Sequence, residues 1–115
     1  MRILFTATAG SGHVRPLFSY ANAIRKRGHQ VRFASTDPAR EAIEKAGFEF
    51  VPVPRATESE REKLGADLDA ATAEESLIIA ARDMFGGIYA KAALPGISDI
   101  IRDWKPDLIV RESSE

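Results

Sequence analysis

The strongest constraint on the fold is a regular alternation of short apolar segments with amphipathic segments in the first half of the chain. Three apolar segments predict short strands, at residues 2–7, 30–35 and 48–53. Two amphipathic segments between them predict helices, residues 14–27 ending before Gly28 and residues 37–46 ending before Gly47. A strand–helix–strand–helix–strand order predicts a right-handed, parallel sheet covered by helices.

The second half of the chain is less regular. Residues 57–75 carry seven Asp or Glu against two Lys or Arg, and they predict a solvated loop or an exposed helix. Three further elements are expected: a helix over 75–92 interrupted at Gly86-Gly87, a helix over 96–104 with Pro95 near its start, and a fourth strand over 108–110. A doubly wound domain normally has five or more strands. We therefore expect residues 1–115 to form an α/β, Rossmann-like domain truncated after its fourth strand.

Composition excludes several classes of protein. Apolar residues make up 44% of the 115 residues, enough for a packed core, and the net charge of −1 argues against a general nucleic-acid or membrane-surface binder. The chain has no cysteine, which excludes a disulfide framework and a thiolate metal site. The first apolar run, Ile3-Leu4-Phe5, is too short for a signal peptide. Together these features favour a cytoplasmic protein with no membrane segment.

A glycine-containing turn, Gly10-Ser11-Gly12-His13, follows the first predicted strand, at the sheet edge where such folds bind ligands. The dinucleotide fingerprint would require a third glycine at position 15, where the chain has Arg15, so the turn is a weak NAD motif. Asp37, after the second strand, could contact a ribose, but Pro38 favours a helix cap at Asp37 instead.

His13 is the most informative single residue, because it opens a predicted helix at this edge of the sheet. A histidine in that place can serve as a general base. His29, which precedes the second strand at the opposite edge, is interpreted as a turn residue without a chemical role.

Several segments together resemble the N-terminal domain of sugar-nucleotide-dependent glycosyltransferases of the two-Rossmann-domain (GT-B) type. They are GHVRP, ANAIRKRGHQVRFAS, AGFEFVPVP and WKPDLIVRE. The similarity is greatest to bacterial enzymes that glycosylate antibiotics and other natural products. It implies an inverting transfer from a nucleotide sugar, such as a UDP- or TDP-sugar, to a hydroxyl of a small acceptor. The resemblance also implies that the reaction requires no metal and no cofactor, with the nucleotide sugar as co-substrate.

The resemblance also implies catalytic roles for two residues. His13 matches the family's general base, and Glu112 matches the acid after the fourth strand that orients the imidazole, where many relatives have Asp. The alternative for Glu112 is a solvated acid near the chain end.

Substrate-binding residues follow from the same resemblance. Ser11 and Gly12 would face the donor diphosphate and the acceptor, although a purely steric need of the turn explains them equally well. Met84, Phe85 and Tyr89 fall in the variable acceptor region and could line a pocket, or they could be helix core.

Three functions remain open at this point. The first is the N-terminal, acceptor-side part of a glycosyltransferase, inactive without the C-terminal domain that would hold the donor. The second is a stand-alone nucleotide- or dinucleotide-binding module, and the third is a folding or assembly unit without a ligand. The partners expected for the first are the acceptor, the nucleotide sugar and the absent domain, and a homodimer is compatible with it.

Overall fold

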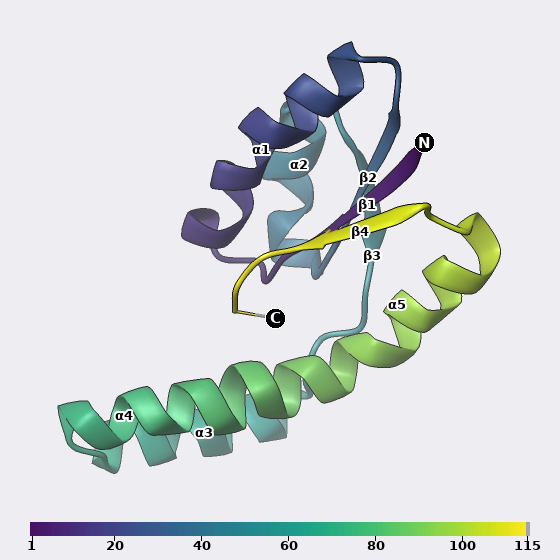
Figure 1. Cartoon of the computed structure of the whole chain (residues 1–115). Helices are drawn as coiled ribbons and strands as arrows, with labels where there is room; N and C mark the ends of the chain where they lie inside the picture. Colours follow the sequence, from purple (N-terminus) through teal and green to yellow (C-terminus); the bar gives the residue numbers. More distant parts are fainter. Residues whose placement is uncertain (115) are drawn as a thin grey trace.

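The centre of the molecule is a parallel sheet, seen in a computed structural model that describes residues 1–114 (Figure 1). Its strands are β1 (Arg2–Thr6), β2 (Gln30–Ser35), β3 (Glu49–Pro52) and β4 (Leu108–Arg111). They lie in the order β3-β2-β1-β4, and every neighbouring pair is parallel. The predicted four-stranded Rossmann-like sheet is confirmed, and β1 lies beside β4 although almost the whole chain separates them.

Helices cover both faces of this sheet, because alternate residues of β1 point to opposite sides. Ile3 and Phe5 pack with Phe33 into a core shared with the helices α1 (Ser11–Lys26) and α2 (Arg40–Lys45). Leu4 packs on the other face with Ala34, against the helix α5 (Ala90–Trp104). Figure 1 shows α1 and α2 together on one side of the strands and α5 on the other.

The acidic segment is helical rather than a loop. It forms α3 (Glu58–Ala70), which begins at a capping box between Thr57 and Glu60, and the start of α4 (Ala73–Ile79). These helices extend away from the sheet (Figure 1), and within residues 1–114 no helix is long and apolar enough to cross a membrane.

The interruption expected at Gly86-Gly87 is wrong. A π-helix, η2 (Ala80–Tyr89), runs through both glycines and joins α4 to α5 without a break, and Pro95 lies inside α5 rather than near its start. A Cβ at Gly86 or Gly87 would lie 3.1 Å from the carbonyl oxygen five residues earlier. Glycine therefore leaves room for the wider π turn at this point instead of ending the helix.

The second correction concerns the start of the helical segment after β2. Thr36 holds the N-cap position of a short 3₁₀ helix, η1 (Asp37–Ala39), so Asp37 is not the cap. The Asp37 carboxylate instead accepts a hydrogen bond of 2.9 Å from Arg40 one turn later. By contrast, Gly28 and Gly47 adopt φ of 87° and 80°, and they terminate their helices as predicted.

Candidate active site

Two backbone hydrogen bonds bring the predicted catalytic residues to one edge of the sheet. The N–H of Glu112, just past β4, donates to the carbonyl oxygen of Thr6 at the end of β1, at 3.1 Å. The N–H of His13, in the first turn of α1, donates to the carbonyl oxygen of Gly10 at 2.9 Å. Because β1 leads directly into α1 and pairs with β4, both side chains reach the same edge.

The two side chains form a hydrogen-bonded pair. Nδ1 of His13 lies 3.0 Å from Oε2 of Glu112, with 32% of the His13 side chain and 15% of the Glu112 side chain exposed. An ionised carboxylate can only accept a hydrogen bond, so Nδ1 must carry the proton. In the neutral ring this leaves Nε2 with a free lone pair, as a general base requires.

The surroundings of Glu112 keep it ionised. Burial by itself raises its pKa, but hydrogen bonds from Ser113 Oγ, from the N–H of Ser114 and from His13 outweigh burial. The net effect is a pKa for the Glu112 carboxyl below its usual value. The negative partner that orients the imidazole is therefore present at neutral pH.

Gly10 is required by the imidazole rather than by its own backbone. Its φ of −61° and ψ of 138° are open to any residue. A Cβ at Gly10, however, would lie 2.8 Å from Cδ2 of His13. The absence of a side chain at this position therefore lets the ring lie against the turn and reach Glu112.

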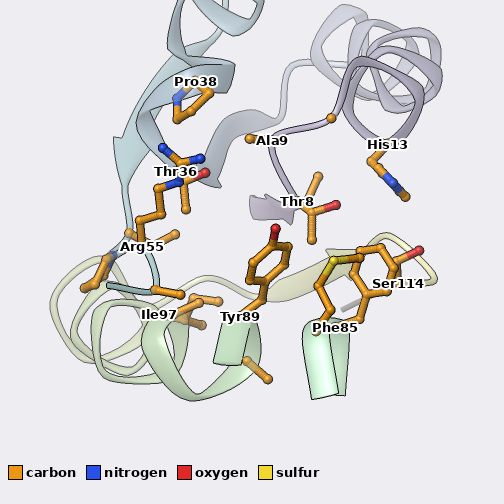
Figure 2. Close-up of a pocket in the computed structure, with 18 of the residues that line it drawn as sticks. Thr8, Ala9, His13, Thr36, Pro38, Arg55, Phe85, Tyr89, Ile97 and Ser114 are labelled. Carbon is orange, nitrogen blue, oxygen red and sulfur yellow. The ribbon is translucent and has the colours of Figure 1, made fainter. Parts of the chain in front are cut away.

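His13 lies at one side of a pocket of about 550 Å³. The loops after β1, β2 and β3 form part of its wall, η2 and α5 form a second part, and Ser114 after β4 also lines it (Figure 2). Met84, Phe85 and Tyr89 line it, which places the predicted acceptor residues at a cavity rather than in the helix core. The centroid of the Phe85 ring lies 5.7 Å from that of the imidazole and 6.0 Å from that of the Tyr89 ring. His13, Phe85 and Tyr89 therefore form a row of neighbouring rings along the pocket wall.

Ser11 and Gly12 are not brought to this pocket. Both are exposed in the first turn of α1, while Gly10 and His13 on either side of them line the cavity. In the part of the chain that the structure describes, no three His, Cys, Asp or Glu side chains come together as a metal site would require.

Sequence reasoning missed four polar residues of the pocket, Thr8, Thr36, Arg55 and Ser114. Each follows a strand in a loop, and none belongs to a motif that could have singled it out. The Oγ1 atom of Thr8 is buried and has no hydrogen-bond partner among the described residues.

The sheet order and the helices on both faces are those of the N-terminal Rossmann-like half of a GT-B glycosyltransferase. The chain belongs to a glycosyltransferase family: residues 3–94 match the glycosyltransferase family 28 N-terminal domain.

Similar proteins include enzymes of antibiotic biosynthesis. The chain is 29% identical to the TDP-daunosamine transferase DnrS of Streptomyces peucetius, over 97% of this chain and 30% of that protein. It is 25% identical to an uncharacterized glycosyltransferase of Methanosarcina mazei, over 96% of this chain and 27% of that protein. Among solved structures it is similar to the glycosyltransferase SsfS6 of Streptomyces sp. SF2575, with a TM-score of 0.79 and 26% identity over 96% of this chain and 33% of that one. The chain thus spans about a third or less of each.

Proposed function

We propose that this chain is the acceptor-side part of an inverting glycosyltransferase in which His13 is the general base. The observation that carries the proposal is the 3.0 Å pair between His13 Nδ1 and Glu112 Oε2 at the wall of a largely apolar pocket. Family membership favours this function over a dinucleotide-binding module or a ligand-free assembly unit.

In the proposed reaction, an acceptor hydroxyl lies against Nε2 of His13. The base takes the hydroxyl proton while the oxygen attacks the anomeric carbon of the nucleotide sugar. The bond from that carbon to the diphosphate breaks, and the nucleoside diphosphate leaves with the electron pair. Attack from the face opposite the leaving group inverts the configuration. Glu112 holds the tautomer and stabilises the imidazolium that forms.

We propose that the donor is a nucleotide sugar held mainly by a second domain outside this chain. DnrS is named as a TDP-daunosamine transferase, and SsfS6 has been crystallised with thymidine diphosphate. Both proteins are about three times as long as this chain. The 115-residue chain alone would therefore contain the base and the acceptor pocket without the donor site, and it would have no useful transferase activity. The reaction would need no metal or further cofactor.

The first test is His13→Ala in the longer protein that the proposal requires, with His29→Ala as the matched control. His29 contacts the N-terminal amino group at 3.0 Å and is not among the pocket residues. Loss of a positioned base predicts a fall in kcat of about 10²–10⁴-fold, with donor affinity retained. His29→Ala should leave kcat unchanged. Full turnover by His13→Ala would remove the base from the mechanism.

Two further assays test the rest of the proposal. The anomeric configuration of the product, read from NMR coupling constants, should be opposite to that of the donor, and retention would exclude direct displacement. Sensitive turnover assays on the 115-residue chain should detect no transfer, and robust transfer would contradict the need for a second domain.

A further inference from the structure

Among the described residues, the pocket has a single permanently charged side chain in its wall, that of Arg55. It follows β3 and is exposed, and within residues 1–114 no Asp or Glu side chain lines the cavity; Glu112, which is hydrogen-bonded to His13, is not among the lining residues. The electrostatic complement of this wall is therefore an anion.

Within residues 1–114, Arg55 differs from the neighbouring arginines in having no partner. Arg32 pairs with Glu49 at 2.8 Å, and Arg40 pairs with Asp37 at 2.9 Å. For Arg55, no hydrogen bond, ion pair or ring contact is found within residues 1–114. Its guanidinium is therefore free to meet a ligand, and its planar donors suit a carboxylate or another pair of anionic oxygens.

Arg55 and His13 lie on different sides of the pocket. Figure 2 shows Arg55 beside Thr36 and Pro38, while His13 lies on the opposite side of the view, with Tyr89 between them. Apolar residues of α5 also line the pocket, Ala93, Leu94 and Ile97, and Figure 2 shows Ile97 on the same side of the view as Arg55. A ligand that reaches from His13 to Arg55 must therefore have an apolar body with a polar group at each end.

We propose that the pocket selects acceptors that carry an anionic oxygen group at the end remote from the reacting hydroxyl, and that Arg55 binds this group. The inference rests on the proposed function only in naming the ligand an acceptor. A donor diphosphate has the same anionic chemistry, but the apolar wall between Arg55 and His13 suits the body of an acceptor better than a nucleotide.

The test measures the affinity of the 115-residue chain for two matched probes by NMR titration. The probes are 6-hydroxy-2-naphthoate, which has a hydroxyl at one end and a carboxylate at the other, and its neutral methyl ester. The variants are Arg55→Gln and, as a control with the same change in net charge, Arg27→Gln. Arg27 is exposed at the C-terminal end of α1 and is not among the pocket residues.

We expect the wild-type chain to bind the acid more tightly than the ester. Because Arg55 is exposed and water screens its contact, Arg55→Gln should weaken binding of the acid about two- to fivefold and leave the ester unchanged. Arg27→Gln should change neither affinity. The preference for the acid should also shrink as salt is added.

Several outcomes would overturn the proposal. In the wild type, these are equal affinities for acid and ester, or no binding of either probe at millimolar concentration. In the variants, they are an equal loss of affinity for both probes in Arg55→Gln, or the same loss of affinity for the acid in Arg27→Gln.

Thymidine diphosphate is the third probe. If Arg55→Gln weakens binding of thymidine diphosphate and leaves binding of the naphthoate unchanged, the anion site belongs to the donor. The proposed function has its own test, the turnover of His13→Ala. Full turnover by that variant would contradict the function of His13 as the base, but it would not change the probe affinities.

Discussion

Replacing Gly10 by alanine should destabilise the chain only while the imidazole of His13 is present. The new Cβ would lie 2.8 Å from Cδ2 of His13, whereas two carbon atoms pack at about 3.5–4.0 Å. The backbone of Gly10, with φ of −61°, accepts alanine without strain. The ring must therefore move by about 1 Å, enough to break its 3.0 Å hydrogen bond to Glu112.

The magnitude follows from two opposing effects. A hydrogen bond to a charged group contributes about 1.5–3 kcal/mol. Because the His13 side chain is 32% exposed and water replaces part of the lost contact, the hydrogen bond between His13 and Glu112 contributes about 1–2 kcal/mol. Alanine restricts the unfolded chain and restores about 0.4–1 kcal/mol. In the wild-type background Gly10→Ala should thus lower the free energy of unfolding by about 0.8 kcal/mol, within a range of about 0–1.6 kcal/mol.

In a His13→Ala background the clash is gone, so the same substitution should raise the free energy of unfolding by about 0.4–1 kcal/mol. Urea unfolding of the four chains in this double-mutant cycle measures the coupling. The matched control is Gly12→Ala, whose Cβ would meet nothing within 4 Å and should have the same effect in both backgrounds. If Gly10→Ala has the same sign in both backgrounds, the glycine is required for a reason other than the ring.

Three further substitutions test separate features. Thr8→Val replaces a buried, unpaired hydroxyl by a methyl group and should raise the free energy of unfolding by about 1 kcal/mol in thermal denaturation; a decrease would mean that Oγ1 has a partner. Thr57→Ala removes the capping box with Glu60 and should cost about 0.5–2 kcal/mol with a loss of helical circular dichroism. Glu112→Gln tests how the ionisation of this carboxyl contributes to the pH dependence of the free energy of unfolding. Because folding lowers the pKa of Glu112, its ionised form stabilises the fold fully above the usual value of 4.5, and that contribution disappears as pH falls through the folded pKa. The stability difference between wild type and Glu112→Gln should therefore shrink on acidification, and a constant difference would contradict the linkage.

Local patterns along the chain were sufficient for the strands and for most of the helices. Apolar runs and helical spacing act over a few residues, and Gly28 and Gly47 end helices through their own backbone conformation. The same local reasoning failed at Gly86-Gly87 and at Pro95. There the preference of single residues to break a helix is overridden by a π turn and by the continuous helix that packs against the sheet.

The site shows the same division. His13 could be singled out because it follows a glycine turn after the first strand, and its pairing with Glu112 could be expected only through resemblance to a family. The two residues are 99 positions apart, so their contact could not be inferred from their spacing along the chain.

By itself, then, the sequence determined the order and kind of the elements and a short set of chemically capable residues, because periodicity and turn chemistry are properties of neighbouring residues. Only the tertiary structure decided which side chains meet. The pairing of β1 with β4 brings Glu112 to His13, and η2 and α5 form a wall of the pocket that Thr8 and Arg55 also line. Those contacts depend on strand order and helix packing between distant segments, which local patterns do not encode.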